Sequence, residues 1–235
     1  MVSTCDDVFS ISPKIRMIRI VLSAACILFA TTVFPNLAFA GSCICLACAF
    51  DARLENFRAV SEAMAPNIDT GECALMRHID PSSDPIKSGD VIGFKPYSNK
   101  SVTIFRVIAK AGDTISLRGG QIILNGRPVS QTFKRHDEIV FPSNPPFPRC
   151  ETTATPGQIC RRTVFKESLS DHVSYEVFDT GVTRGDDTAE ALVPEGYVFV
   201  MGDHRDNALD SRFGREIGGP GFVSLDSVVG IFDDL

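Results

Sequence analysis

The chain has 235 residues, enough for one substantial domain and an accessory segment. Its composition is ordinary for a globular protein, with 44% hydrophobic and 22% charged residues. The formal net charge of −6 argues against a nucleic-acid-binding protein, because such proteins usually carry a basic patch.

The N-terminus has a basic tail followed by an apolar segment. Residues 1–19 include three basic residues near their end, and residues 20–40 are mostly apolar. The first apolar run, 20–34, would span about 22 Å as a helix, less than a bilayer core, and Ala38 to Ala40 resemble a cleavage site, which favours a cleaved secretory signal. Residues 37–50 are again apolar apart from Ser42, so an uncleaved membrane anchor is the alternative. Both place the rest of the chain outside the cytoplasm.

The eight cysteines fall into groups. Cys150 and Cys160 bracket a short loop, and outside the cytosol we expect them to form a disulfide. Three more, Cys43, Cys45 and Cys48, cluster after the apolar segment. Their spacing fits zinc poorly and the set is incomplete, so we expect free or lipid-modified thiols and no metal site.

From residue 51 the chain indicates a mainly β, antiparallel fold. Residues 51–60 form a short polar approach, and the motif Val60-Ser61-Glu62-Ala63-Met64-Ala65-Pro66-Asn67 follows. Asn125-Gly126 is a strong hairpin signal because both turn positions need positive φ. Short strands separated by turn residues are predicted at 72–79, 91–94, 102–108, 114–117, 121–124, 196–201 and 228–232.

Residues 130–190 differ from the rest. Four prolines fall between Phe141 and Pro148, and 180–190 is polar and acidic. This composition predicts an inserted, loop-rich subdomain with a few short strands, at 163–165 and 174–178, within a domain of residues 51–235.

Three further motifs follow the first in order. They are Lys87-Ser-Gly-Asp90-Val91-Ile-Gly-Phe94; Ile104-Phe105-Arg106-Val107 through Gly112-Asp113 with Leu124-Asn125-Gly126; and Met201-Gly202-Asp203-His204-Arg205-Asp206-Asn207-Ala208-Leu209-Asp210-Ser211-Arg212. Together with the basic and apolar N-terminus, the four motifs resemble those of the bacterial type I signal peptidases of the S26 family, which remove signal peptides with a Ser-Lys dyad. The resemblance implies an antiparallel β fold with an apolar groove that binds the peptide as an added strand.

The resemblance breaks at the catalytic positions. The nucleophile position is Ala63, the general-base lysine is replaced by Phe105, and the serine that orients the lysine is replaced by Ala208. A serine–lysine mechanism needs a hydroxyl and a neutral amine, and hydrocarbon stands at both places. The sequence therefore predicts a signal-peptidase-like protein with no intact catalytic residue.

The resemblance assigns roles to residues that remain. Ser61 matches the hydroxyl that helps stabilise the oxyanion, and Met64, Pro66 and Arg106 belong to the peptide groove. The residues implied to hold the last motif are Asp203, Arg205, Asp206, Asp210, Ser211 and Arg212. His204 stands where relatives often have asparagine.

Three alternatives are open. Ser61 with Lys110 could form another dyad, although strand parity puts Lys110 on the opposite face from Phe105. Ser211 with His204 could act together, although a structural hydroxyl and a surface imidazole is the plainer interpretation. A self-cleaving repressor protease would share the Ser-Lys fold, but the acidic charge and the exported N-terminus argue against it.

These inferences fix the expected partners. We expect the protein to bind a signal peptide or another extended apolar peptide, to contact membrane lipid, and to use no cofactor, metal or nucleic acid. We expect it at the outer face of the cytoplasmic membrane, or free in the periplasm if it is cut near Ala40.

Overall fold

The computed structural model describes residues 43–96 and 101–233. The basic tail, the apolar segment 20–40, Cys5 and Cys26 lie outside these residues. Within the two described ranges, no helix has the length and apolar character that crossing a bilayer requires. From Cys43 onward the chain forms a single unit.

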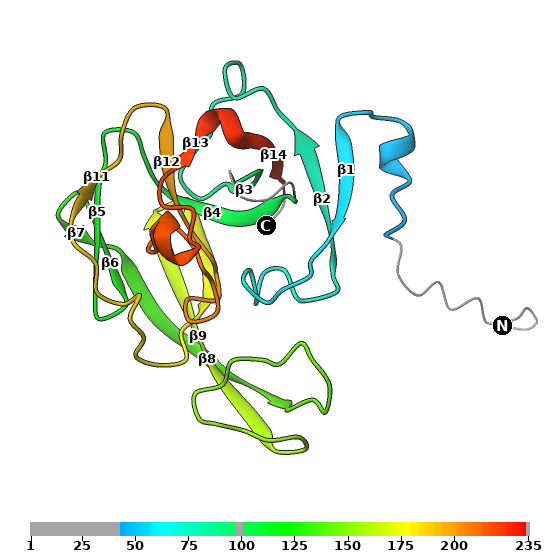
Figure 1. The fold of residues 1–235 in the computed structure, drawn as a ribbon, viewed down its shortest axis with the longest axis vertical. Coiled ribbons are helices and arrows are strands. Elements are labelled where there is room, and N and C mark those ends of the chain that lie inside the picture. The colour runs from blue at the N-terminus through cyan, green and yellow to red at the C-terminus, as the bar shows by residue number, and fades with distance from the viewer. Residues whose placement is uncertain (1–42, 97–100, 234–235) are drawn as a thin grey trace, which may run out of the picture. The chain divides into compact units, whose positions relative to one another are not determined.

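The largest element is a seven-stranded antiparallel sheet that brings distant parts of the chain together (Figure 1). Its strands, in spatial order, are β1 (Leu54–Arg58), β2 (Cys73–His78), β14 (Val228–Phe232), β3 (Val91–Phe94), β4 (Thr103–Lys110), β12 (Tyr197–Met201) and β13 (Val223–Ser224). The last named strand of the sequence thus pairs with both β2 and β3. The mainly β, antiparallel fold that the sequence predicts is confirmed.

Two smaller sheets complete the body. One contains β11 (Ala191–Leu192), β5 (Thr114–Arg118), β6 (Gln121–Leu124) and β7 (Arg127–Pro128). Its β6–β7 turn is formed by Asn125 and Gly126, with φ of 52° and 73°, as the sequence predicts. The other sheet contains β10 (Val173–Phe178), β9 (Ile159–Ser170) and β8 (Ser130–Val140). Short 3₁₀ turns occur at Ala47–Ala49, Arg215–Ile217 and Leu225–Ser227.

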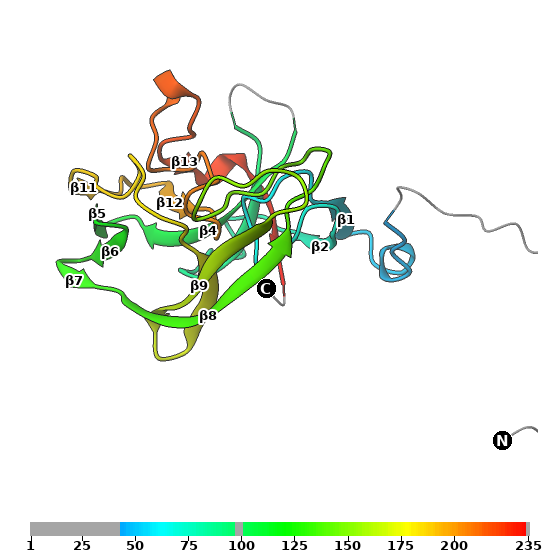
Figure 2. The same cartoon turned by 90° about the horizontal axis from the view of Figure 1, so that it is seen from below.

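Two expectations about the strands are too narrow. Residues 51–60 are not only a polar approach, because β1 pairs with β2 along its whole length. Residues 130–190 contain long strands as well as loops, because β8 and β9 have 11 and 12 residues, where only short strands are expected. The two strands form the long hairpin that extends from the body in Figure 1 and is seen from below in Figure 2. Much of β8 is polar and exposed, so its sequence lacks the apolar alternation that marks a half-buried strand.

The core that carries the candidate site lies between the central strands and the turn after β1. It includes Met64 and Ile68 from that turn, Phe105 from β4, and Val200 from β12. Phe105 is 4% exposed and its ring lies 6.1 Å from that of Phe94, measured between centroids. The core therefore extends directly up to the positions that the sequence singles out.

Six described cysteines form three disulfides. Cys43 joins Cys73, Cys45 joins Cys48, and Cys150 joins Cys160, with sulfur–sulfur distances of 1.95, 1.97 and 1.95 Å. The expectation of free or lipid-modified thiols at Cys43, Cys45 and Cys48 is wrong. The sequence could not pair Cys43 with Cys73, because that pairing depends on β1 lying beside β2.

Candidate functional site

The turn that carries Ala63 is held against the last motif by backbone hydrogen bonds. The amide of His204 donates to the Ala63 carbonyl at 3.0 Å. Within the turn, the amides of Asn67 and Ile68 both donate to the Met64 carbonyl, at 3.0 and 2.9 Å. Buried backbone groups are costly to leave unpaired, so these bonds fix where Ala63 lies relative to the segment after β12.

Ala63, Phe105 and Ala208 meet at Gly202. A Cβ placed on Gly202 would lie 2.3 Å from the Ala208 Cβ, 2.6 Å from the Ala63 carbonyl oxygen and 3.4 Å from the Phe105 ring. Only glycine fits there, because such approaches are too close for any side chain. The three positions that lack catalytic groups thus surround one point, and Ala63 and Ala208 pack against the same core as Phe105.

No other pair forms a dyad here in the described part of the chain. Ser61 is exposed and its hydroxyl has no partner there. Lys110 is exposed at the far end of β4, opposite Val198. The Ser211 hydroxyl accepts a hydrogen bond from the Val200 amide at 3.0 Å, a structural role.

His204 is buried, not a surface imidazole as expected. Its ring lies 5.2 Å from that of Phe178, and neither ring nitrogen has a hydrogen-bond partner among the described residues. Burial lowers the pKa of His204 to about 4, so the ring is neutral at pH 7. An imidazole that no hydroxyl approaches cannot take a proton from a serine in this arrangement.

Two buried ion pairs position the motif after β12. The Arg106 guanidinium donates to both carboxylate oxygens of Asp203, at 2.9 and 2.7 Å, and the Asn67 side chain donates to the same carboxylate at 2.7 Å. Arg205 forms a similar two-bond pair with Glu167, at 2.9 and 2.7 Å. Bidentate pairs of this kind fix orientation as well as distance.

The other charged residues of the motif bind locally. Arg212 pairs with Asp210 at 2.9 Å, and the Asp210 carboxylate also accepts the Gly202 amide at 2.9 Å. Asp206 accepts hydrogen bonds from the amide and hydroxyl of Thr180. The motif is therefore held by its own residues and by four residues from other parts of the chain, namely Asn67, Arg106, Glu167 and Thr180.

Sequence reasoning missed Glu167 and Tyr175, which complete this network. The Tyr175 hydroxyl donates to Glu167 at 2.6 Å, and the Arg106 guanidinium lies 4.1 Å above the Tyr175 ring. A glutamate in a strand of alternating polarity is expected at the surface, so only the packing of β9 shows that Glu167 is 1% exposed. Met64 and Arg106, expected at a peptide groove, are 4% and 1% exposed, whereas Pro66 is half-buried.

One edge of β4 is open beside these residues. β12 pairs with β4 only from Arg106 to Lys110, whereas β3 pairs with Thr103 to Arg106. Val107 exchanges backbone hydrogen bonds with Gly89 and Asp90, so by alternation the amide and carbonyl of Ile104 face away from β3. They point toward the side where β12 has ended, and no strand of the described residues pairs with this short edge.

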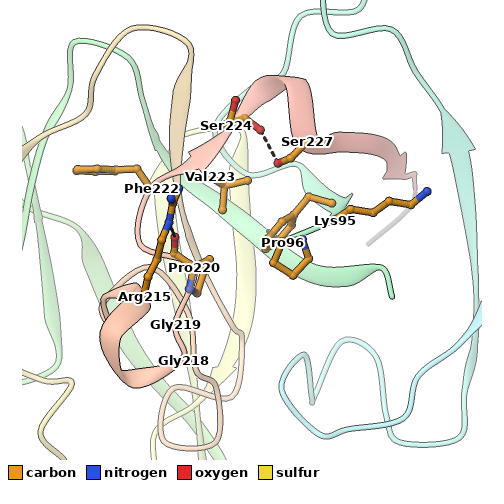
Figure 3. A pocket seen from close by; sticks show the side chains of 11 residues that line it. Lys95, Pro96, Arg215, Gly218, Gly219, Pro220, Phe222, Val223, Ser224 and Ser227 are labelled. Atoms are coloured by element: carbon orange, nitrogen blue, oxygen red, sulfur yellow. Dashed lines mark hydrogen bonds between the residues drawn. The ribbon is translucent and has the colours of Figure 1, made fainter. Parts of the chain in front are cut away.

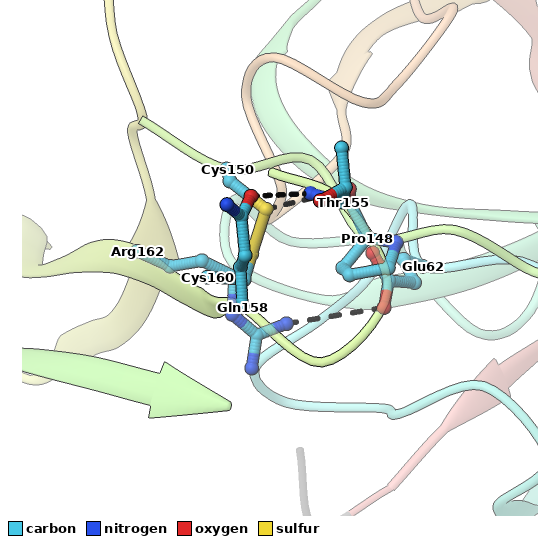
Figure 4. The surroundings of a disulfide bond; sticks show 7 residues. All are labelled: Glu62, Pro148, Cys150, Thr155, Gln158, Cys160 and Arg162. Atoms are coloured by element: carbon cyan, nitrogen blue, oxygen red, sulfur yellow. Dashed lines mark hydrogen bonds and ion pairs between the residues drawn. A yellow bond between two sulfur atoms is a disulfide. The ribbon is translucent and has the colours of Figure 1, made fainter. Parts of the chain in front are cut away.

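A disulfide-linked loop lies beside Glu62, the residue before Ala63 (Figure 4). The Cys150–Cys160 disulfide ties this loop to β9. Glu62 bridges the two parts, since its carboxylate lies 3.9 Å from the Arg162 guanidinium and close to the Arg149 backbone. Burial raises the pKa of Glu62, and Arg162 opposes that rise.

Two hollows lie near this region. One, of about 480 Å³, borders Ala208 and is lined by Arg149, Arg184 and Leu209 among others. The other, of about 100 Å³, is mostly apolar and lies between the end of β3 and the loop before β13 (Figure 3). Phe94 lines that second hollow, but none of Ala63, Phe105 and Ala208 does.

Comparisons with known proteins agree on one family. A family model described as "Signal peptidase, peptidase S26" matches residues 17–233. Signal peptidase I of Haemophilus influenzae is 33% identical over 135 residues, which cover 54% of this chain and 36% of that protein. The chain thus spans little more than a third of that relative's length.

Other relatives align over more of their length. Signal peptidase I of Aquifex aeolicus is 28% identical over 192 residues, covering 72% of this chain and 70% of that protein. Signal peptidase I of Bacillus caldolyticus is 25% identical over 183 residues, covering 76% of each. A solved signal peptidase I from Enterococcus faecalis V583 is 20% identical, covers 63% of this chain and 97% of that one, and has a TM-score of 0.34.

Proposed function

Because this chain belongs to the S26 signal peptidase family, whose role is the removal of signal peptides, we propose that it is a non-catalytic member that binds an extended peptide without cutting it. The observation that carries the proposal is the meeting of Ala63, Phe105 and Ala208 at Gly202. The family's mechanism needs a hydroxyl, an amine and a second hydroxyl there, and this chain supplies none of them.

The joint replacement supports loss of the chemistry more strongly than any single change would. A phenylalanine at 105 fills the space of a lysine with a ring that packs on Phe94. With the small side chains at 63 and 208, it closes the site with hydrocarbon. An apolar contact has no group that could accept a proton, so peptide binding is the function that such a site retains.

The open edge of β4 is where we propose that the peptide binds. A peptide in extended conformation would pair with the amide and carbonyl of Ile104 and become an added strand. Such binding takes most of its affinity from backbone hydrogen bonds, which explains how it could survive without catalytic groups. It also places the peptide next to Phe105 and Ala63.

We propose that the protein works at the outer face of the cytoplasmic membrane. Residues 1–19 and 20–40 would then be the basic tail and the membrane anchor, or a signal segment cut near Ala40. Residues 51–235 would form the peptide-binding domain, with residues 130–190 as an insertion that carries the β8–β9 hairpin.

The test is a binding measurement on the full-length protein with a fluorescently labelled signal peptide. We expect saturable binding by fluorescence anisotropy and an intact peptide afterwards. Ile104→Pro removes the amide that faces the open edge but no hydrogen bond to β3, so it should fold and bind at least tenfold more weakly. Ile104→Val is the matched control and should bind like the original. Equal binding by the proline variant would contradict the proposed edge, and cleavage that Ser61→Ala abolishes would contradict the loss of catalysis.

A further inference from the structure

The hollow beside Ala208 contains two arginines that form no ion pair in the described part of the chain. Arg149 and Arg184 are both exposed, and neither guanidinium donates to a carboxylate there. By contrast, Arg205, which also lines the hollow, is committed to Glu167 by two hydrogen bonds. The chain as a whole is acidic, with a net charge of −6. Two arginines without an ion pair in the described residues therefore give this hollow a locally positive potential, which favours binding of an anion.

Arg149 is held in place by its own backbone. Its backbone lies close to the carboxylate of Glu62, the residue before Ala63, and opposes the rise in the pKa of that carboxylate. The next residue is Cys150, tied to Cys160 by the disulfide, and the Glu151 amide donates to the Arg161 carbonyl at 3.0 Å. The loop thus carries Arg149 to a fixed point beside the turn of the candidate site.

Arg184 is held by a different segment of the chain from Arg149. Its guanidinium lies 5.3 Å above the ring of Phe213, within the range of a cation–π contact. The turn that carries it is closed by Thr183, whose amide and hydroxyl both donate to Asp186. The two guanidinium groups therefore come from separate, anchored segments.

The carboxylate in the lining is partly neutralised by its own hydrogen bonds. Asp206 is the acidic residue of this hollow, and one of its oxygens accepts the Thr180 amide and hydroxyl, at 2.6 and 2.9 Å. Its other oxygen is buried without a partner among the described residues. The exposed Asn207 adds an amide that could donate to a ligand. The hollow therefore offers donors to a negatively charged group.

Ala208 connects this hollow to the proposed peptide-binding edge. It lines the hollow on one side and meets Phe105 and Ala63 at Gly202 on the other. In the family, the bond to be cut lies at the nucleophile position, here Ala63. A peptide that has already been cut would end at this point with a new carboxylate, whereas an uncut one has a neutral amide there.

We propose that this hollow binds the C-terminal carboxylate of an already cut peptide, between Arg149 and Arg184. This proposal rests on the peptide binding proposed above and specifies the class of peptide, namely one with a free C-terminal carboxylate. The protein would hold released signal peptides in preference to uncut preproteins. A carboxylate held by two guanidinium groups makes charge-assisted hydrogen bonds that an amide cannot replace.

The experiment compares three forms of one labelled signal peptide on the full-length protein by fluorescence anisotropy. The first has a free C-terminal carboxylate, the second a C-terminal amide, and the third an amide preceded by aspartate, which supplies a side-chain carboxylate instead. We expect the free acid to bind roughly tenfold more tightly than the amide, and the aspartate form to resemble the amide. Arg149→Gln and Arg184→Gln should each reduce this preference and leave binding of the amide unchanged.

Arg127→Gln is the matched control, since Arg127 is also exposed and has no ion pair among the described residues but lies in β7. It should leave all three affinities unchanged. Equal binding of acid and amide, or a tighter aspartate form, would overturn the carboxylate proposal and leave peptide binding standing. If neither acid nor amide binds, the peptide-binding function itself fails.

Discussion

The His204 amide donates a hydrogen bond to the Ala63 carbonyl, with a nitrogen–oxygen distance of 3.0 Å. This bond joins the first motif to the last and sets both against Gly202. It uses backbone atoms only, so it persists whatever side chains stand at 63 and 204. The arrangement of the family's site can therefore remain after its reacting groups are gone.

Gly202→Ala should destabilise the protein. The added methyl group would lie 2.3 Å from the Ala208 Cβ and 2.6 Å from the Ala63 carbonyl oxygen, neither of which is a flexible chain end. Overpacking of this kind costs about 1–3 kcal/mol, measurable by urea unfolding. Adding Ala208→Gly removes one of the two clashes and should recover part of the loss. If Gly202→Ala alone has the same free energy of unfolding as the original protein, these residues do not pack as closely as described.

Asp203→Ala should lower the free energy of unfolding far more than the loss of an exposed ion pair does. The Arg106–Asp203 pair has side chains 2% and 1% exposed, so removing Asp203 takes the carboxylate away from a buried guanidinium. That loss typically costs 3–5 kcal/mol, about 4 kcal/mol at the centre of the range. Glu138→Ala breaks the Arg161–Glu138 pair, whose side chains are 53% and 50% exposed, and should cost less than about 1 kcal/mol. Comparable losses in urea unfolding would contradict the buried network.

His204 should make stability depend on pH between about 4 and 6.5. Burial lowers its pKa to about 4 in the folded state, so the unfolded chain binds more protons in this range and stability rises with pH. The stabilising contribution of the neutral, buried His204 is complete above pH 6.5 and is lost as the pH falls through 4. Its full size is on the order of 3 kcal/mol.

The measurement is the free energy of unfolding at several pH values for the original and for His204→Asn, which cannot titrate. The variant should lose this slope, whereas His172→Asn, at an exposed histidine, should keep it. Asp179 opposes the slope, because burial, with Asp206 and Asp186 nearby, raises its pKa to about 6, and its contribution falls as pH rises from 3.8 to 6. Asp179 is present in both proteins, so an unchanged slope in His204→Asn would show that His204 is not buried and neutral.

The strands that the sequence predicts are those with a clear local signal. β6 and its turn follow from apolar residues ending at Asn125-Gly126, and β3 and β14 are short apolar runs between turn residues. β1 and β8 lack such a signal. Their conformation depends on pairing with β2 and β9, which is a long-range property that local patterns do not encode.

The residues of the candidate site also fall into two groups, those that the sequence identifies and those that only the fold reveals. The motifs identify Ala63, Phe105 and Ala208 by position, and the structure brings all three to Gly202. The buried partner of Arg205 could not be predicted, because Glu167 comes from a strand that looks polar in sequence. His204 looks like a surface residue for the same reason, since its burial depends on Phe178 from β10.

The central claim is that hydrocarbon has replaced the groups that transfer the proton. The most direct measurement compares preprotein cleavage by the original protein with cleavage by the triple variant Ala63→Ser, Phe105→Lys, Ala208→Ser. We expect no cleavage by the original and cleavage at the signal peptide boundary by the variant. Cleavage by the original protein that is lost in Ser61→Ala would contradict the claim, because it would show that another serine performs the reaction.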